Sequence, residues 1–297
     1  MADQPKLTVV IPCYNYGRYI YAAIESVLKQ DCHVFRLVVV NDGSTDNSVD
    51  EIKRAFSDWE AFTDNELLLI SQENKGVSAA LNTGLKNATG EYIVTFDADD
   101  IMAPGRLSLQ INYLESHPET GCVGGRFVRI NKSGELIARK HKNHEIERYD
   151  FERAFSAGLV VGGGLAAYRH DVLRMVGGYD ERIKIQDFQI TLKVAEAGYY
   201  IDILPDVVTY YRKHAGSLSS DYKNEFKYGL DVLNRYKSCP GYQEARAKLV
   251  VKALRAAVTD DKKYAWELFK QIPLSQWDKT VVKRFRHFLL KRKSSRH

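Results

Sequence analysis

The sequence predicts an α/β protein with a doubly wound, mainly parallel central sheet, followed by a C-terminal α-helical region. Through the first hundred residues, short β-branched apolar runs alternate with apolar residues at helical spacing, and short loops separate them. This alternation is typical of consecutive βαβ units. Beyond residue 221 only helical patterns remain. We therefore expect an α/β domain over residues 1–221 and a helical region over residues 222–297.

The first half of the α/β domain is predicted to hold four strands and three helices. Each strand is a short run rich in Val, Ile, Leu or aromatic residues, and each helix has apolar residues three or four positions apart. The strands are expected at residues 7–12, 35–40, 67–71 and 92–96, and the helices at 19–30, 46–56 and 77–87.

The second half of the domain is less regular, and a glycine triplet, Gly162 to Gly164, interrupts it. The triplet is either a wall along which a substrate passes close to the backbone, or a bend packed tightly under a helix. Residues 139–152 are polar and are expected to form a surface loop. The other expected segments are helices at 104–117, 169–176 and 187–198, strands at 121–130, between the triplet and residue 168, and at 201–211, a turn at 131–134, and C-terminal helices at 226–236, 243–258, 264–271 and 277–292.

Composition places the chain among ordinary soluble proteins, with 44% hydrophobic and 27% charged residues. No apolar run approaches the ~20 residues of a membrane span, and the N-terminus lacks the apolar segment of a signal peptide. The four scattered cysteines indicate reduced thiols in a cytoplasmic protein, without a zinc site. Residues 279–297 carry eight Lys or Arg and no acid, which leaves about −3 of the total charge of +5 on residues 1–278. This division argues against a nucleic-acid partner.

Three carboxylates follow the predicted strand at residues 92–96: Asp97, Asp99 and Asp100. Ligands bind at the carboxyl ends of the strands in an open α/β sheet. Carboxylates so close together repel one another unless a cation lies among them, and oxygen ligands suit Mg²⁺ or Mn²⁺. An acidic, solvated turn is the simpler alternative for a single Asp-x-Asp.

Other strand ends narrow the class of ligand. The first turn has no Gly-x-Gly-x-x-Gly motif, which argues against a dinucleotide-binding dehydrogenase, and no Walker A loop is present. Instead the strand ends offer Tyr14 as a flat face for a base, Asp42 as an acceptor for a ring N–H, and the Asp97 and Asp99 carboxylates. This set suits a nucleoside diphosphate bound through its base and a metal-bridged pyrophosphate.

Four segments together resemble family 2 glycosyltransferases. They are Val10-Ile-Pro-Cys-Tyr-Asn15, Val39-Val-Asn-Asp-Gly-Ser-Thr-Asp46, Asn74-Lys-Gly-Val-Ser-Ala-Ala-Leu-Asn82 and Phe96-Asp-Ala-Asp-Asp100. The resemblance covers about residues 5–220. It implies the GT-A fold, a nucleotide-sugar donor, a divalent metal and inversion of configuration. It also implies a nucleotide-binding half over about residues 1–103 and an acceptor-side half over about 104–221.

The resemblance also implies roles for residues of the nucleotide-binding half. Pro12 and Tyr14 would line the base pocket, and Asp42 would bond the edge of the base, which is usually uracil. Lys75 lies in the loop that approaches the nucleotide. Asp97 would hold the ribose and Asp99 the metal ion.

In the acceptor-side half, Asp187 resembles the family's catalytic base. A carboxylate at a helix N-terminus is stabilised as the anion and can accept a proton from an incoming hydroxyl; a simple helix cap is the alternative. The segment after residue 210 resembles a late loop in which His214 would return to the metal, and Arg212 or Lys213 would neutralise phosphate charge. Two positions depart from the family: Leu81 stands where Arg is frequent, and Gln186 replaces the first residue of an acidic pair.

The last helix, residues 277–292, has Val281, Val282, Phe285, Phe288 and Leu289 on one side and Lys or Arg elsewhere. This pattern suits a helix on an anionic membrane surface, or a helix packed on the body of the protein. We expect a cytoplasmic enzyme, with attachment to the inner face of the cytoplasmic membrane left open. It would transfer a sugar from a UDP-sugar to a glycan or lipid-linked saccharide in cell-surface polysaccharide or glycoconjugate synthesis.

Two alternatives to this function remain. A sugar-nucleotide pyrophosphorylase would share the α/β architecture but should carry a glycine-rich phosphate loop near residue 10, which is missing. A non-catalytic glycan- or nucleotide-binding module of the same fold is consistent with the departures at Leu81 and Gln186.

Overall fold

The computed structural model describes residues 6–32, 35–137, 145–214 and 221–290. The chain divides into two compact units, residues 1–154 with 159–214, and residues 155–158 with 215–297. The boundary predicted between residues 221 and 222 falls within the second unit. Each unit is described by itself.

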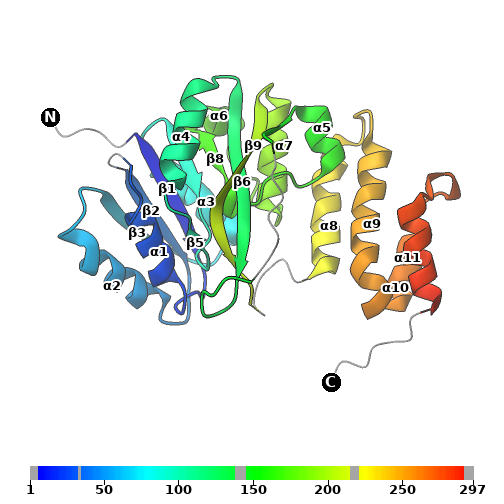
Figure 1. Cartoon of the computed structure of the whole chain (residues 1–297), viewed down its shortest axis with the longest axis horizontal. Coiled ribbons are helices and arrows are strands. Elements are labelled where there is room, and N and C mark those ends of the chain that lie inside the picture. Colours follow the sequence, from blue (N-terminus) through cyan, green and yellow to red (C-terminus); the bar gives the residue numbers. More distant parts are fainter. Residues whose placement is uncertain (1–5, 33–34, 138–144, 215–220, 291–297) are drawn as a thin grey trace. The chain divides into compact units, whose positions relative to one another are not determined.

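The first unit is built on one sheet with the strand order β3-β2-β1-β4-β8-β6-β9-β5, to whose strand β9 the short β7 also pairs (Figure 1). Strands β1 to β4 are parallel neighbours, as the sequence predicts. In the rest of the sheet β6 and β9 are parallel, whereas β8, β5 and β7 run antiparallel to their partners. The strands are β1 (Leu7–Cys13), β2 (Arg36–Asp42), β3 (Glu66–Gln72), β4 (Tyr92–Thr95), β5 (Ile101–Met102), β6 (Thr120–Ile130), β7 (Glu147–Tyr149), β8 (Ala167–Arg169) and β9 (Tyr200–Arg212).

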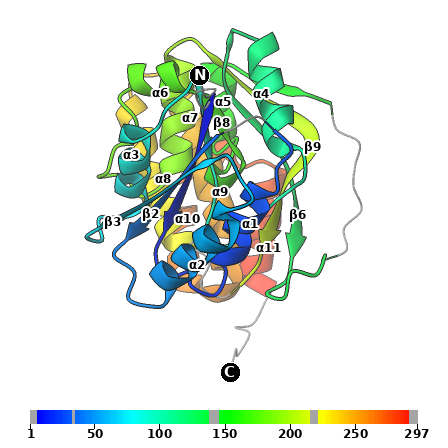
Figure 2. The same ribbon diagram turned by 90° about the vertical axis from the view of Figure 1, so that its left-hand side faces the viewer.

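Helices cover both faces of the parallel strands, which confirms the doubly wound arrangement (Figure 2). Apolar residues of α1 (Ile20–Leu28), α2 (Ser48–Glu60) and α4 (Arg106–Ser116) pack with Val9, Ile11, Leu37 and Val39 in one large core. On the opposite face Ala80 of α3 (Val77–Lys86) packs with Val38 and Val40. Successive residues of β1 and β2 point to opposite faces of the sheet, and both faces are buried, as is typical of central strands in a parallel sheet.

The second half of the unit departs from the prediction at two places. Residues 147–149 form strand β7 and residues 151–157 form α5 (Phe151–Ala157), so the predicted polar loop over 139–152 is wrong for its last residues, while 138–144 lie outside the described residues. Strand β7 has only three residues, Glu147, Arg148 and Tyr149, and two of them are charged, so the sequence contains no apolar run there that would predict a strand. The glycine triplet leads into a 3₁₀ turn, Gly163–Leu165, and only then into β8. Helices α6 (His170–Met175) and α7 (Gln186–Glu196) agree with the prediction.

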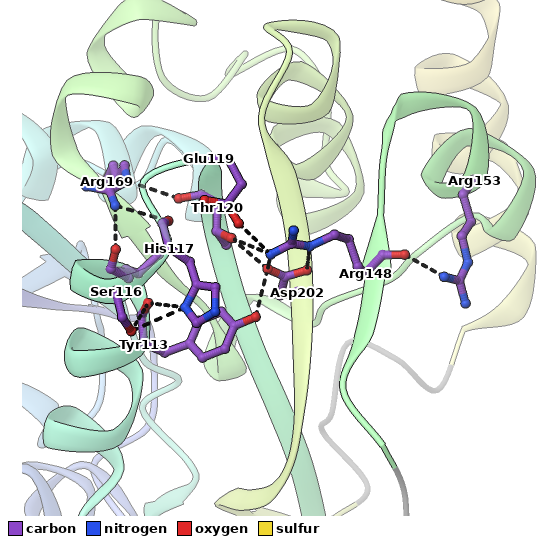
Figure 3. Close-up of polar contacts among 10 residues, drawn as sticks. Tyr113, Ser116, His117, Glu119, Thr120, Arg148, Arg153, Arg169 and Asp202 are labelled. Carbon is purple, nitrogen blue, oxygen red and sulfur yellow. Dashed lines mark hydrogen bonds and ion pairs between the residues drawn. The ribbon is translucent and has the colours of Figure 1, made fainter.

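A buried carboxylate ties β7 to β9 (Figure 3). The Asp202 side chain is fully buried and accepts two hydrogen bonds from Arg148, Nε to Oδ1 and Nη2 to Oδ2, both at 2.9 Å. Thr120 and Tyr113 donate to the same carboxylate at 2.6 Å and 3.0 Å. Burial would raise the pKa of Asp202, but the hydrogen bonds from Arg148, Thr120 and Tyr113 outweigh it and lower the pKa. The ion pair of Arg148 with Asp202 therefore adds to the backbone pairing that holds β7 against β9.

The second unit is helical, as predicted, with α8 (Tyr222–Leu233), α9 (Tyr242–Asp260), α10 (Lys262–Phe269) and α11 (Lys279–Leu290). Its core includes Val281, which is 1% exposed, and the rings of Phe285 and Phe288 pack against it. Phe285 lies 5.2 Å from Phe269 and 5.1 Å from Trp277, measured between ring centroids. The apolar face that the sequence suggested for lipid insertion is therefore largely occupied within this unit, although Val282 and Leu289 are exposed. None of the described helices combines the length and apolar character of a membrane span.

Candidate active site

The carboxylate cluster lies where β4 ends, in the loop between β4 and β5, on the edge predicted for ligands. Asp97 and Asp99 are partly exposed, whereas Asp100 is 1% exposed. Burial, with the charges of Asp97 and Asp99, raises the pKa of Asp100 to about 9, against the N–H and charge of Arg212. The three carboxylates thus differ in exposure: Asp100 is buried within the protein, whereas Asp97 and Asp99 are partly open to solvent.

His214 reaches Asp99 from the end of β9, 115 residues away in the sequence. Its Nε2 lies 2.8 Å from Asp99 Oδ2. Two aromatic rings of the loop after β1 flank the imidazole: Tyr19 at 5.1 Å and Tyr16 at 6.0 Å between ring centroids. The structure therefore brings together the two residues predicted as metal ligands.

Arg212, predicted as a phosphate ligand, makes several contacts within the protein, and its predicted role stays a prediction. It is 5% exposed, and its N–H donates to Asp100 Oδ1 at 2.8 Å while Nε donates to the Asp99 carbonyl at 2.8 Å. Its Nη1 donates to the carbonyls of Asn131 and Lys132 at 3.3 Å and 3.1 Å. These contacts make Arg212 a clamp on the carboxylate loop, because most of its donors are committed to the protein.

Asp187 lies in the first turn of α7, next to the glycine triplet. Ile185 is the cap residue of this helix, without a side-chain cap bond, so Asp187 is not its N-cap. The Asp187 Oδ2 accepts a hydrogen bond from the Gly163 N–H at 3.4 Å, and Oδ1 accepts one from the Phe188 N–H at 3.0 Å. A Cβ built on Gly163 would meet Gln186 and Asp187 at ordinary contact distances of 3.6 Å and 3.8 Å.

Asp97 connects the carboxylate cluster with Asp187. Burial raises the pKa of Asp97 to about 7, and the charges of Asp99 and Asp187 act in the same direction, while Arg106 and the Gly164 N–H oppose them. The backbone at Gly164 lies so close that a Cβ there would overlap the Asp97 carboxylate. The triplet is thus a tight turn close to Asp97 and Asp187, and its predicted role as a wall along which substrate passes stays a prediction.

Asp42 is buried at the end of β2, where it holds the loop before α3. Its Oδ1 accepts hydrogen bonds from Gln72 Nε2 at 2.7 Å and from the Lys75 N–H at 2.9 Å, and its Oδ2 accepts one from the Gly76 N–H at 2.8 Å. The Lys75 side chain is exposed. A carboxylate oxygen can accept two bonds, so Oδ2 retains one acceptor site, and base recognition by Asp42 stays a prediction.

Of the predicted base-pocket residues, Pro12 lies near the end of β1, paired with Val40 of β2, and Tyr14 lies in the loop after β1, where it is 46% exposed. Asn15 and Thr45 fasten this loop to the one after β2: Asn15 N–H donates to Ser44 Oγ at 3.0 Å, and Thr45 N–H donates to Asn15 Oδ1 at 2.8 Å. Asn15 has a φ of 58°, a left-handed conformation that Asn tolerates. The two loops form a fastened edge that presents the Tyr14 ring to solvent.

Sequence reasoning missed Arg106, which is 1% exposed and lies beneath the site. Its Nη1 donates to the Gly164 carbonyl at 2.7 Å and to Thr209 Oγ1 at 3.0 Å, and Nε donates to Gln110 Oε1 at 2.8 Å. Burial lowers the pKa of Arg106 to about 9, against the charges of Asp97 and Asp100. The only indication in the sequence is that Arg106 and Gln110 are four residues apart and each stands directly before an apolar residue of the same helix, Leu107 and Ile111. They therefore lie at the border of its apolar face.

Asp99 and His214 fit a divalent cation as a pair. Two ligands that bind one ion at right angles, each about 2.1 Å away, lie about 3 Å apart, and the observed separation is 2.8 Å. Among the described residues no three His, Cys, Asp or Glu side chains are grouped to hold an ion. Water or substrate oxygens would have to complete the coordination, as is usual for Mg²⁺.

Comparison with known proteins places these features in a family. The model for "Glycosyl transferase family 2" matches residues 8–177, more than half of the chain. Glycosyltransferase GlyA of Streptococcus pneumoniae serotype 4 is 45% identical over 100 residues, 34% of this chain and 14% of that protein. The chain therefore corresponds to only a small part of that relative's length.

Solved structures resemble the whole described fold. Mannosyltransferase PcManGT from Pyrobaculum calidifontis, in complex with GDP-Man and Mn²⁺, has a TM-score of 0.64 at 22% identity, covering 97% of this chain and 86% of that chain. S. aureus TarS 1-349, in complex with UDP-GlcNAc, has a TM-score of 0.61 at 18% identity, covering 95% of this chain and 89% of that chain. The shared fold is the GT-A fold, which confirms the expected fold class.

Proposed function

The chain belongs to glycosyl transferase family 2, and on that premise we propose that it transfers one sugar from a UDP-sugar to a hydroxyl of a glycan or lipid-linked saccharide, with inversion. The observation that carries this proposal is that the candidate general base, Asp187, lies near the carboxylates that include the candidate metal ligand Asp99. One glycine turn contacts both groups: the Gly163 N–H donates to Asp187 Oδ2 at 3.4 Å, and Gly164 lies against the Asp97 carboxylate. Asp99, two residues from Asp97, contacts His214.

The reaction would be a single displacement. Asp187 removes the proton of the acceptor hydroxyl while the hydroxyl oxygen forms a bond to the anomeric carbon of the donor sugar. The bond from that carbon to the phosphate oxygen breaks, and the nucleoside diphosphate leaves. The first turn of α7 favours the anionic form of Asp187, because the unpaired N–H groups there carry partial positive charge.

Asp99 and His214 would hold the divalent metal, Mn²⁺ or Mg²⁺, and the bound ion would stabilise negative charge on the leaving diphosphate. Asp97 would bind the ribose. Lys75 and Lys213 are exposed and are further candidates for phosphate contacts beside Arg212, whose Nε and Nη1 donate to backbone carbonyls.

A UDP-sugar is the donor we propose, with Pro12 and Tyr14 against the base and Asp42 at its edge. The fold alone does not select the base, since one similar structure holds GDP-Man and another holds UDP-GlcNAc. The acceptor-side half would bind a growing saccharide of the cell surface. We place the protein in the cytoplasm, attracted to the anionic inner face of the membrane.

For that attraction, the exposed Lys283 and Arg286 of α11 would contribute about 1 kcal/mol each near an anionic surface. Charge, rather than insertion of Phe285 or Phe288, would supply the affinity, because those rings are packed in the helical unit. Sedimentation with phosphatidylserine vesicles, compared with neutral vesicles, tests this: Lys283→Gln/Arg286→Gln should bind the anionic vesicles more weakly. Equal binding by both proteins would contradict it.

Asp187→Asn tests the catalytic proposal. Loss of a general base typically lowers turnover by ~10²–10⁴-fold, so UDP release in the presence of acceptor should fall by that factor while donor affinity stays near wild type. Asp171→Asn is a matched control, because Asp171 also lies in the first turn of a helix and caps its own backbone, at Val172. Collapse of donor binding in Asp187→Asn would assign that residue to the donor site instead.

A non-catalytic binding module remains the second candidate, because the chain departs from the family at two positions. Leu81, where Arg is frequent in the family, is buried, and Gln186, next to Asp187, replaces an acidic residue. Such a module would bind the donor but release no UDP, in wild type or in Asp187→Asn. A panel of nucleotide sugars screened for metal-dependent thermal stabilisation, followed by UDP release, separates the two functions.

A further inference from the structure

Helix α3 lies between two parts of the candidate site. Its N-terminal end follows directly on Lys75 and Gly76, whose N–H groups donate to Asp42. Gly76, the residue before the helix, has a φ of 89°, a left-handed conformation that glycine adopts without strain. One end of α3 is thus fixed to the predicted base-binding carboxylate.

Two polar side chains of α3 hold the chain segment that leads to Asp187. Asn82 bonds Tyr179 in both directions: its Oδ1 accepts from the Tyr179 N–H at 2.9 Å, and its Nδ2 donates to the Tyr179 carbonyl at 2.8 Å. The same Nδ2 donates to Glu181 Oε1 at 2.9 Å. Ser78 Oγ donates to the Ile183 carbonyl at 3.1 Å. Because Ser78 and Asn82 are four residues apart, they share one face of the helix.

The approach of Asn82 depends on a glycine. Gly178 has a φ of 61°, and a Cβ at this position would lie 2.8 Å from Asn82 Oδ1. No other residue type fits this position without moving Asn82. The backbone is therefore shaped to receive the Asn82 amide.

The other side of the segment is held by α7 itself. Gln189 Oε1 accepts from the Asp180 N–H at 2.7 Å, and its Nε2 donates to the carbonyls of Asp180 and Ile183 at 3.0 Å and 3.2 Å. Residues 179–183 are outside any helix or strand, so buried backbone groups there need such partners. With α3 on one side and α7 on the other, the start of α7 has a fixed position relative to the start of α3.

We propose that Asn82 and Ser78 are positioning residues for Asp187. They act through Tyr179 and Ile183, and they set the distance between the donor-binding edge and the catalytic carboxylate. The inference rests on the proposed function, because it takes Asp187 as the general base. It adds a role for α3 that is separate from nucleotide contact.

Asn82→Ala is the principal test. Because misplacement by about 1 Å can cost ~10²-fold in rate, we expect kcat to fall at least about tenfold, with the Kd for the UDP-sugar within about twofold of wild type. Asn87→Ala is the matched control: Asn87 lies at the C-terminal end of the same helix, and its amide donates to the Thr83 carbonyl at 2.9 Å. This variant should keep wild-type kcat.

A double-mutant cycle separates positioning from general loss of structure. If Asn82 acts through Asp187, then Asn82→Ala should cost little further rate in the Asp187→Asn background. A full additional loss in that background, or an unchanged kcat in Asn82→Ala alone, would overturn the proposal. So would a collapse of donor affinity in Asn82→Ala, which would make Asn82 part of the donor site.

Amide hydrogen exchange provides a readout that does not depend on transfer. Asn82→Ala should speed exchange in peptides that cover residues 179–187, and Asn87→Ala should not. Wild-type protein that releases no UDP, with this exchange result intact, would refute the proposed function and leave the structural contact standing. Unchanged exchange in Asn82→Ala would refute the positioning role whatever the activity.

Discussion

Gly164→Ala is the substitution whose consequence the structure defines most closely. A Cβ at this position would overlap Oδ2 of Asp97, and the Asp97 Cγ and Cβ would also lie too near, at 2.7 Å and 3.2 Å. Rotation of the Asp97 carboxylate alone would not relieve the overlap, because the Asp97 Cβ also lies within 3.2 Å of the added methyl group. Either the carboxylate or the Gly163–Leu165 turn must therefore move.

The magnitude follows from these contacts. Overpacking of a well-packed site typically costs about 1–3 kcal/mol, and loss of the Gly164 N–H contact to Asp97 would add about 1 kcal/mol. We expect the free energy of unfolding to fall by about 2–4 kcal/mol. Donor affinity should fall as well, because Asp97 is the proposed ribose ligand and Asp99 is its neighbour.

Gly162→Ala is the control on the same turn. A Cβ at Gly162 would meet only Leu165, at 3.7 Å, and the Gly162 φ of −72° is available to any residue. This variant should be as stable as wild type or about 0.4–1 kcal/mol more stable, through the smaller entropy of its unfolded chain. Urea denaturation and titration calorimetry with UDP measure both effects. Wild-type stability and UDP affinity in Gly164→Ala would refute the reasoning.

Three further predictions address the metal pair, the ion pair of β7 and the helical unit. His214→Ala and Asp99→Ala should each abolish Mn²⁺-dependent UDP binding, measured by calorimetry; full binding by wild type in EDTA would contradict this. Asp202→Asn should lower the free energy of unfolding at pH 7 by about 1–3 kcal/mol, because it removes charged hydrogen bonds to a fully buried carboxylate but leaves behind an Arg148 side chain that is 38% exposed. Because the folded-state pKa of Asp202 lies below its ordinary value of about 3.9, its contribution is complete above about pH 5 and disappears as pH falls through the folded pKa; the difference between the two proteins should therefore shrink toward pH 3, and a constant difference would refute the assignment. Phe285→Ala should destabilise the helical unit by about 2–4 kcal/mol, and the exposed Val282→Ala by less than about 0.5 kcal/mol; equal effects would show that α11 is not packed through Phe285.

The sequence predicts the parallel half of the sheet well, because there each strand is a separate apolar run with a helix after it. It also predicts that Asp99 and His214 belong together, through the resemblance to a family. It does not reveal Arg106 or Asp202, since a buried charge looks in the sequence like any surface charge until its partners are known. For a related reason the sequence left two alternatives open for the last helix, a membrane surface or packing on the protein, because an amphipathic pattern defines an apolar face but not what covers it; the structure shows Phe285 packed in the helical unit.

The origin of the candidate site from distant segments has a consequence for synthesis of the chain. Asp99 is made more than a hundred residues before His214, and β9, which carries Arg212 and leads to His214, lies inside the sheet between β6 and β5. A nascent chain that has emerged only through α7 therefore has its carboxylates in place without the clamp and the imidazole that complete the site. Because domains tend to form from the N-terminus during translation, such an intermediate would expose the edges of β6 and β5 and four mutually repelling acids, Asp187 included. The proposed metal pair, Asp99 and His214, would thus be complete only after residue 214 has left the ribosome.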